Sequence, residues 1–307
     1  MNELISAAIK LRNPILSADT NAFRLFDADG DGASDVVVDC YDGHWVVSRK
    51  MGGCPQWLLG AGAKSVWLKL LEQGEKSAPD LIEGQAPEMP FLVRENGVNF
   101  EIDLTAGYSQ GIFLDQRLNR KRVGELVREA VAAGDGREVK VLNTFAYTCG
   151  FSAVAAANGA TTTSIDLSGN YLEWGKRNLA ANGCDPADHY FVKGDVQQWL
   201  RQFAKKERKF DGIILDPPTF SRVKGGKGVF RVEKDYAALV ELAAKVCVEG
   251  GWILCCTNHR GLEPWRFESM VRAGLRAAGH EEAEIEPAEM PPEFSGEQYL
   301  KSLWIRL

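Results

Sequence analysis

The sequence lacks the features that mark several large classes of protein. Its longest apolar runs, such as residues 36–38 and 251–256, are far too short to cross a bilayer. Its seven cysteines include no C-x-x-C pair, which argues against a structural zinc site and against a disulfide framework. Residues 1–12 show no secretory signal pattern. We therefore expect a cytoplasmic protein with no membrane anchor and no metal centre.

The composition is that of a folded protein with a sizeable core. Of the 307 residues, 45% are hydrophobic and 25% are charged, which excludes wholesale disorder and allows one large or two ordinary domains. The net charge of −6 argues at first against a nucleic-acid partner. However, residues 1–106 hold 9 basic against 16 acidic residues, a balance of −7, and the remainder holds 27 against 26, a balance of +1. The acidity therefore belongs to the first third of the chain.

Residues 1–106 predict a small α+β domain. Two pairs of short apolar segments flank turn-forming residues, as in β-hairpins: 36–38 with 45–47, and 91–93 with 98–102. Apolar residues at helical spacing predict a helix over residues 58–71. Residues 77–90, with three prolines, predict a surface loop.

Residues 107–307 predict a second domain in which strands and helices alternate. We expect strands at residues 139–143, 161–166, 190–192, 212–216, 252–257, 282–285 and 299–307, and helices at 151–159, 168–182, 196–204, 235–248 and 263–278. Repeated strand–helix units imply an open, mainly parallel sheet that is covered on both faces. Such a sheet binds its ligand at the carboxyl ends of the strands.

The loop after the first of these strands does not suit a dinucleotide. Residues 143–150 contain one glycine, Gly150, where a dinucleotide site needs three so that the backbone can approach a pyrophosphate. The loop also carries the aromatic residues Phe145 and Tyr147. It suits a nucleoside without phosphate, such as S-adenosylmethionine, with Asn143 to Gly150 around the amino-acid end of that molecule. An ordinary strand-to-helix turn is the alternative interpretation.

Three aspartates stand at the ends of three successive strands. Asp166 is placed to accept hydrogen bonds from ribose hydroxyls, and Asp195 to reach an adenine amino group. Asp216 follows the fourth strand. Any one of them could simply cap a helix. Together they predict a nucleoside-cofactor site.

The segment Asp216-Pro217-Pro218-Thr219-Phe220 is the most specific motif. The two prolines fix the backbone beyond the strand and so hold a carboxylate and an aromatic ring at the edge of the sheet. This arrangement is suited to a planar base, because the ring of Phe220 can stack on it while the carboxylate or a backbone carbonyl contacts its edge. A proline-rich loop that only covers the sheet is the alternative.

These motifs together resemble a known family. From Thr20 to Leu307 the chain resembles the bacterial large-subunit rRNA base methyltransferases, in which a class I, Rossmann-like domain with a mostly parallel seven-stranded sheet follows a small α+β domain. The segments that match are 20–24, 38–39, 111–117, 141–143, 147–148, 150–151, 166–168, 172–174 and 216–220. The resemblance implies S-adenosylmethionine as cofactor and adds Phe113, Asp115, Arg117 and Leu167 to its site.

The segment after the fifth strand bears on which atom is methylated. In the cytosine-C5 branch a cysteine there adds to carbon 6 of the base, because carbon 5 is otherwise not nucleophilic. In this sequence Asn258 takes that place, and Cys255 and Cys256 lie inside the strand, where we expect core residues. The Asn-x-Arg-Gly form resembles the guanine-N7 branch, which needs no covalent step. Cytosine-C5 methylation, methylation of an exocyclic amine and a non-catalytic relative remain alternatives.

Basic residues predict where RNA would bind. After the Asp216 motif come Arg222, Lys224, Lys227, Arg231 and Lys234, which predict a loop that contacts phosphates; a merely solvated loop is the alternative. A second basic cluster lies at residues 117–122. By resemblance the partner is ribosomal RNA, naked or in an assembly intermediate. The sequence leaves the oligomeric state open between monomer and homodimer.

Overall fold

The chain forms two compact units. The computed structural model describes residues 3–14, 16, 18–71, 77–134, 136–222 and 229–307. The first unit comprises Met1–Leu118 together with Met290–Gln298, and the second comprises Asn119–Glu289 together with Tyr299–Leu307. The structure thus differs from the expected division at residue 106 in two ways: the boundary lies later, and a segment near the C-terminus returns to the first unit. None of the described helices is both long and apolar enough to cross a membrane.

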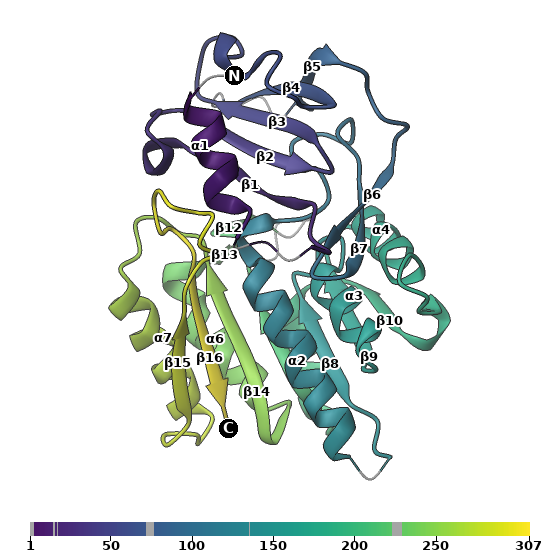
Figure 1. Ribbon diagram of the computed structural model, residues 1–307. Coiled ribbons are helices and arrows are strands. Elements are labelled where there is room, and N and C mark those ends of the chain that lie inside the picture. The colour runs from purple at the N-terminus through teal and green to yellow at the C-terminus, as the bar shows by residue number, and fades with distance from the viewer. Residues whose placement is uncertain (1–2, 15, 17, 72–76, 135, 223–228) are drawn as a thin grey trace. The chain divides into compact units, whose positions relative to one another are not determined.

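The first unit is built on a five-stranded sheet. Its strands lie in the order β1 (Ala22–Asp27), β2 (Val37–Tyr41), β3 (His44–Arg49), β4 (Ser65–Leu70) and β5 (Asp80–Gly84). The β3–β4 pair is parallel and the other pairs are antiparallel. Helix α1 (Glu3–Arg12), the hairpin of β6 (Phe91–Glu95) and β7 (Val98–Ile102), and the 3₁₀ turns η1 (Ala28–Asp31), η2 (Gln56–Leu58) and η3 (Leu114–Gln116) complete the unit (Figure 1). Both predicted hairpins are confirmed.

Two local predictions for the first unit are wrong. The expected helix over residues 58–71 is instead the turn η2 followed by the strand β4. Gly60 and Gly62 adopt φ values of 68° and 101°, which no α-helix contains, so the apolar spacing is interrupted. The expected loop over 77–90 contains β5, an edge strand whose residues are mostly exposed and therefore show no apolar alternation.

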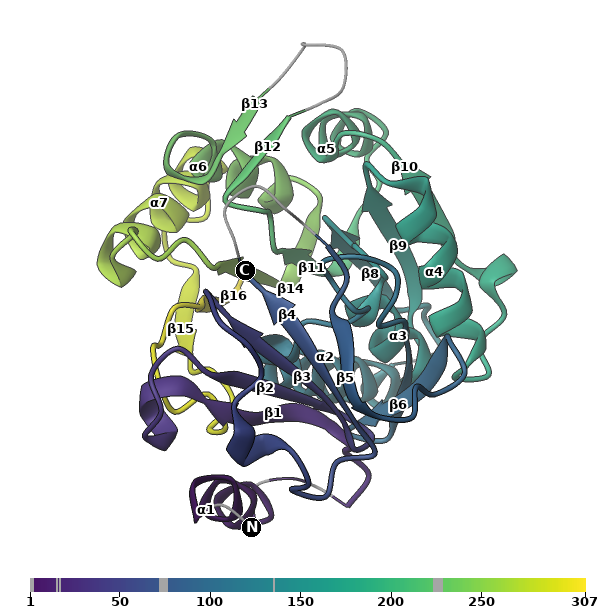
Figure 2. The same cartoon turned by 90° about the horizontal axis from the view of Figure 1, so that it is seen from above.

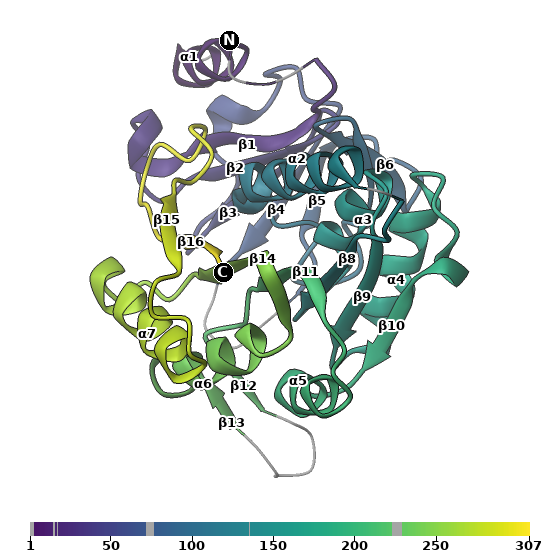
Figure 3. The same cartoon turned by 90° about the horizontal axis from the view of Figure 1, so that it is seen from below.

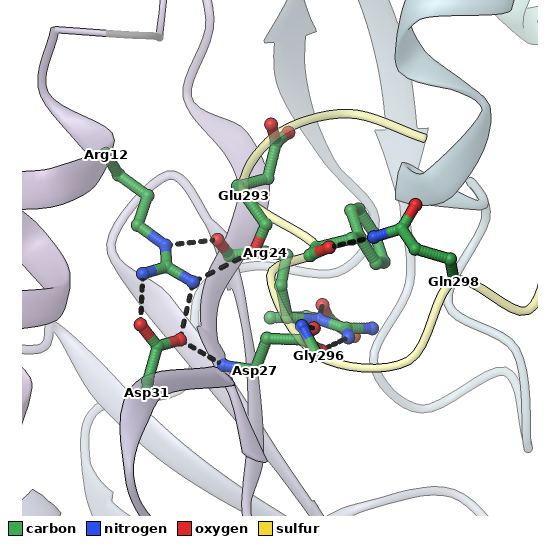
Figure 4. A network of polar contacts seen from close by, with 9 residues as sticks. Arg12, Arg24, Asp27, Asp31, Glu293, Gly296 and Gln298 are labelled. Carbon is green, nitrogen blue, oxygen red and sulfur yellow. Dashed lines mark hydrogen bonds and ion pairs between the residues drawn. The ribbon is translucent and has the colours of Figure 1, made fainter. Parts of the chain in front are cut away.

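A buried polar network attaches residues 290–298 to the first unit (Figure 4). The guanidinium of Arg12 binds the carboxylate of Asp31 at 2.5 and 2.6 Å and also donates to the carbonyl oxygen of Glu293 at 2.9 Å. The amide of Gly296 donates to Asp27 at 2.7 Å. Arg117 forms a bidentate pair with the Glu293 carboxylate at 2.7 and 2.6 Å. These contacts join residues far apart in the sequence, so no local pattern could predict the two-segment unit.

Replacement of Glu293 by alanine is expected to destabilise the first unit by about 3–5 kcal/mol. The side chains of Arg117 and Glu293 are 4% and 0% exposed, so the variant would leave a buried guanidinium without its carboxylate. Urea unfolding of the variant and the wild type measures the difference. The double variant Arg117→Met/Glu293→Leu removes both charges and should recover much of the loss. A loss below about 1 kcal/mol in the single variant would contradict the prediction.

The second unit contains a seven-stranded sheet. Its order is β10 (Tyr190–Lys193), β9 (Thr161–Asp166), β8 (Lys140–Thr144), β11 (Phe210–Leu215), β14 (Cys247–Thr257), β16 (Lys301–Arg306) and β15 (Glu284–Ala288). The first five strands are mutually parallel, and β16 is antiparallel to both of its neighbours. The predicted α/β fold with a mostly parallel sheet is therefore confirmed.

Helices cover both faces of this sheet (Figures 2 and 3). Helices α5 (Val196–Lys205), α6 (Val232–Ala244) and α7 (Pro264–Ala277) lie on one face, and α2 (Arg117–Ala133), α3 (Gly150–Ala157) and α4 (Gly169–Ala180) lie on the other. A short hairpin of β12 (Phe220–Arg222) and β13 (Val229–Arg231) lies beside α6, and the 3₁₀ turn η4 (Pro186–Asp188) precedes β10. All six residues of β11 are buried, which suits a central parallel strand.

The strand register brings the carboxyl ends to one level. Leu215 on β11 pairs with Thr144 on β8 and with Cys255 on β14, and Thr144 pairs with Ile165 on β9. The residues just beyond this row therefore share one edge of the sheet. The strand order reverses at β8, since β9 lies on one side of it and β11 on the other. Open α/β sheets bind ligands at such a point.

Candidate functional site

The loop between β8 and α3 has an unusual backbone. Phe145, Tyr147 and Cys149 adopt φ values of 53°, 48° and 60°, although none of them is glycine. Each such residue costs on the order of 1–3 kcal/mol and persists only where the surroundings hold it. Here the amide of Tyr147 donates to Asp166 at 2.9 Å, and the amide of Cys149 donates to the Ala146 carbonyl at 2.7 Å. Strain concentrated in one loop is typical of a functional site.

Asp166 links this loop to the end of β9. One carboxylate oxygen accepts from the Tyr147 amide, and the other accepts from the Ser168 amide at 2.8 Å. Burial raises the pKa of Asp166 above its ordinary value, and these backbone hydrogen bonds partly oppose the shift. A carboxylate can accept about four hydrogen bonds, so both oxygens retain capacity for ligand hydroxyls. The neighbouring Leu167 is 42% exposed, and the rings of Tyr147 and Tyr171 meet edge to face at 4.6 Å.

Asn143, near the end of β8, is almost fully buried. Its amide group donates to the hydroxyl of Ser152 at 2.9 Å, and that hydroxyl is 2.8 Å from the hydroxyl of Ser164. These bonds connect β8, α3 and β9. The Asn143 side chain therefore ties the end of β8 to helix α3, which Gly150 begins. A ligand contact by either residue stays a prediction.

Asp195 caps helix α5. One oxygen of its carboxylate accepts from the Gln198 amide at 2.9 Å, as expected for an N-cap residue. The capping role that the sequence left open for this aspartate is thus present. A contact with adenine through its other oxygen stays a prediction.

The segment after β11 meets the segment after β14. The hydroxyl of Thr219 donates to the side-chain oxygen of Asn258 at 3.1 Å. Asp216 is half-buried, Pro217 is buried and Pro218 is exposed. Phe220 is the first residue of β12 and is 46% exposed. The segment 216–220 and Asn258 thus follow the carboxyl ends of two neighbouring strands and meet through Thr219.

Thr219 belongs to the segment 216–220 that the sequence predicts to bind the base, and its side chain has a contact that the sequence does not indicate. The predicted roles in this motif fall on the aspartate, the prolines and the phenylalanine, whereas the threonine hydroxyl reaches Asn258. The only sequence signal for it was its position inside the motif, because its partner lies 39 residues farther along the chain.

The cysteines of β14 are core residues, as predicted. Cys255 and Cys256 are both 0% exposed. Burial raises the pKa of the Cys255 thiol to about 12, and the sulfur of Cys256 lies 3.5 Å from the Ser302 hydroxyl. A buried thiol that resists ionisation is a poor nucleophile. Neither side chain is placed for covalent addition to a base.

The predicted RNA-binding residues are only partly described. Lys224 and Lys227 lie outside the described residues, and the structure gives the backbone of Arg222 in β12 but not its side chain. Arg231 and Lys234 are exposed, and the Arg231 amide donates to Asp235 at 2.7 Å. A phosphate-contacting role for these five residues stays a prediction.

Most of the second basic cluster is engaged within the protein. Arg117 and Arg120 are both 3% exposed; Arg117 pairs with Glu293, and Arg120 lies over the ring of Phe151. Arg122 binds Glu286 at 2.5 Å. Arg117, Arg120 and Arg122 thus serve packing and ion pairs, whereas the Lys121 side chain is 54% exposed.

The remaining predicted cofactor residues belong to the first unit. Phe113 is 50% exposed, Asp115 lies half-buried in η3, and Arg117 carries the bidentate pair with Glu293. Their assignment to the cofactor site stays a prediction. Among the described residues there is no group of three or more His, Cys, Asp or Glu that could hold a metal ion.

Comparison with known proteins identifies the family. The model of the S-adenosylmethionine-dependent methyltransferases matches residues 47–305. YwbD of Bacillus subtilis (strain 168), provisionally named a ribosomal RNA large subunit methyltransferase, is 32% identical over 307 residues, which cover 96% of this chain and 75% of that protein. Ribosomal RNA large subunit methyltransferase K/L of Aliivibrio fischeri (strain ATCC 700601 / ES114) is 36% identical over 216 residues, which cover 70% of this chain and only 28% of that longer protein.

A solved structure agrees with this relationship. SMU.776, provisionally described as a methyltransferase and crystallised with S-adenosylhomocysteine (SAH), superposes with a TM-score of 0.83 at 28% identity; the match covers 100% of this chain and 83% of that chain. The match of the family model over most of the chain decides the family. The chain belongs to the S-adenosylmethionine-dependent methyltransferases, and S-adenosylmethionine is its cofactor.

Proposed function

We propose that this protein methylates N7 of a guanine in large-subunit ribosomal RNA, without a covalent enzyme intermediate. The observation that carries the proposal is the hydrogen bond between Thr219 and Asn258. It joins the two segments that bear Asp216 and Phe220 on one side and Asn258 on the other. These groups suit a planar base, and they lie at the same edge of the sheet as the Asp166 loop.

The residues around β8 and β9 fit the cofactor. Asp166 would hold the ribose hydroxyls, since its oxygens already accept backbone amides and retain capacity for more hydrogen bonds. The strained loop 145–149 would surround the amino-acid end, where its backbone can approach a ligand without a phosphate. When bound, S-adenosylmethionine supplies an electrophilic methyl group on a sulfonium. The contribution of the protein is to hold the base in line with that group.

The groups beside β11 and β14 would hold the guanine. The exposed ring of Phe220 offers a stacking surface, and stacking of a base on an aromatic side chain contributes about 1–3 kcal/mol. Asn258, held by Thr219, would bind the edge of the base. Pro217 and Pro218 fix the backbone between the carboxylate and the ring, so that little ordering remains when the base binds.

The chemistry of N7 suits what these residues offer. N7 carries a lone pair and no proton, so the reaction needs no general base. The positive charge moves to the guanine as the bond forms, and the carboxylate of Asp216 would stabilise it there. The cytosine-C5 alternative needs an accessible thiolate, whereas Cys255 and Cys256 are fully buried in β14.

The names of the relatives support ribosomal RNA as substrate. Both YwbD and the K/L protein carry large-subunit ribosomal RNA methylation in their names. The exposed Arg231 and Lys234, with Arg222, Lys224 and Lys227 nearby in the sequence, would contact phosphates next to the target base. The near-neutral balance of residues 107–307 fits an enzyme that releases its product, because binding would rest on a local group of charges.

Mapping of the methylated nucleoside tests the proposal. Purified protein and labelled cofactor are incubated with large-subunit RNA from cells that lack the gene, and the RNA is then digested and analysed by mass spectrometry. We expect 7-methylguanosine at one position, and no modification at that position in the untreated RNA. The appearance of 5-methylcytidine or of a base methylated on an exocyclic amine would overturn the N7 assignment. Absence of label in any RNA would overturn the substrate class.

A further inference from the structure

The carboxyl ends of β11 and β14 share a buried hydrogen-bond donor. Tyr236, on α6, is 0% exposed, and its hydroxyl lies 3.0 Å from the carbonyl oxygen of Leu215 and 3.0 Å from that of Cys256. A tyrosine hydroxyl has one hydrogen, which the two carbonyls share in this geometry. Burial raises the pKa of Tyr236, so the hydroxyl keeps that hydrogen. The two strand ends are therefore connected through one atom.

The two carbonyls lie directly before the proposed base-binding groups. Leu215 immediately precedes Asp216, and Cys256 precedes Asn258 by two residues. The pairing of β11 with β14 ends at Leu215 and Cys255, and Pro217 and Pro218 have no amide hydrogen to donate beyond it. The spacing of the two segments beyond the sheet must therefore be fixed by other groups, and Tyr236 lies where the segments separate.

The position of Tyr236 is itself well fixed. Its ring packs edge to face on that of Phe267, with 4.9 Å between centroids and 75° between planes. The start of the same helix also holds the Asp216 segment, because the Val232 amide donates to the Thr219 carbonyl at 3.2 Å. Helix α6 thus contacts this part of the chain at two places: Tyr236 donates to the Leu215 carbonyl, and the Val232 amide donates to the Thr219 carbonyl.

We propose that Tyr236 is a positioning residue for methyl transfer, which sets the distance between Asp216 and Asn258 through the carbonyls of Leu215 and Cys256. It lies under the site, within the core. The inference rests on the proposed function for the roles of Asp216 and Asn258. Enzyme rates are sensitive to such spacing, since a displacement of about 1 Å can cost about 10²-fold in rate.

The test compares Tyr236→Phe with Val240→Ala. The first variant removes only the hydroxyl, and the second trims a fully buried side chain one turn farther along the same helix. We expect Tyr236→Phe to lower kcat about 10- to 100-fold while KM for RNA and Kd for the cofactor change less than about twofold. Val240→Ala should lose at least as much thermal stability with no change in kcat. Unchanged kcat in Tyr236→Phe, or an equal loss of kcat in Val240→Ala, would overturn the inference.

Hydrogen exchange gives a second readout that needs no RNA. Peptides covering residues 215–220 and 256–260 should exchange faster in Tyr236→Phe than in the wild type, and at the wild-type rate in Val240→Ala. If the wild type methylates no RNA, the proposed function fails, and the exchange result still decides whether Tyr236 fixes these segments. Unchanged exchange in Tyr236→Phe would show that the hydroxyl does not hold the strand ends.

Discussion

Replacement of Asp216 by asparagine is expected to lower kcat of methyl transfer by about 10²–10³-fold, the size of effect seen when one group that stabilises transition-state charge is lost. The reason is the charge that moves from the sulfonium to the guanine during the reaction. Asparagine keeps the shape of the side chain and removes the negative charge. Single-turnover transfer of a labelled methyl group to RNA measures the rate constant without a contribution from product release.

The matched control for this variant is Asp188→Asn. Asp188 lies in the exposed turn η4, before β10, and the substitution makes the same change of charge away from β11. We expect it to keep the wild-type rate. The rate should also be nearly equal in H₂O and D₂O, because N7 loses no proton. A large solvent isotope effect would favour methylation of an exocyclic amine, with Asp216 as the proton acceptor.

Replacement of Asp166 by asparagine is expected to weaken cofactor binding by about 10²-fold. A hydrogen bond to a charged group contributes about 1.5–3 kcal/mol, and the carboxylate would accept from the ribose hydroxyls. The substitution also disturbs the bond from Tyr147, which helps to hold the strained loop. Calorimetric titration with S-adenosylmethionine measures the dissociation constant. Asp185→Asn, at an aspartate that caps η4, is the control that should bind as the wild type does.

The affinity for S-adenosylmethionine should fall at low pH, because Asp166 becomes protonated there. Burial raises the pKa of its carboxyl, so protonation begins at a higher pH than for an ordinary aspartate. The ionised form accepts the hydroxyls. Binding should therefore be full above the raised pKa and weaken as the pH falls through it. The Asp166→Asn variant should lack this dependence, and an equal pH response in the variant would assign it to another group.

Much of the second unit could be predicted from the sequence because its signals are local. The strand Thr161–Asp166 follows from its apolar residues, and the helix after it from apolar spacing and its capping residues, signals that lie within short windows of the chain. The first unit was harder, because exposed β5 has no alternation and Gly60 and Gly62 interrupt a pattern that looks helical.

By itself the sequence determined the alternation of strands and helices that implies a mostly parallel sheet, the acids at the strand ends and the absence of a dinucleotide fingerprint. Each of these signals lies within a short stretch of neighbouring residues. Tertiary structure decided the rest. It showed that Arg117 binds Glu293, that Asp195 caps α5, and that Thr219 meets Asn258. It also placed the hydroxyl of Tyr236 between two strand ends. The contacts of Arg117, Thr219 and Tyr236 all join residues that are 20 or more positions apart in the sequence. For Asp195 the sequence allows either a helix cap or a ligand contact, and the structure shows its hydrogen bond with the Gln198 amide. Only the folded chain fixes such partners, because the packing of the sheet sets their distances.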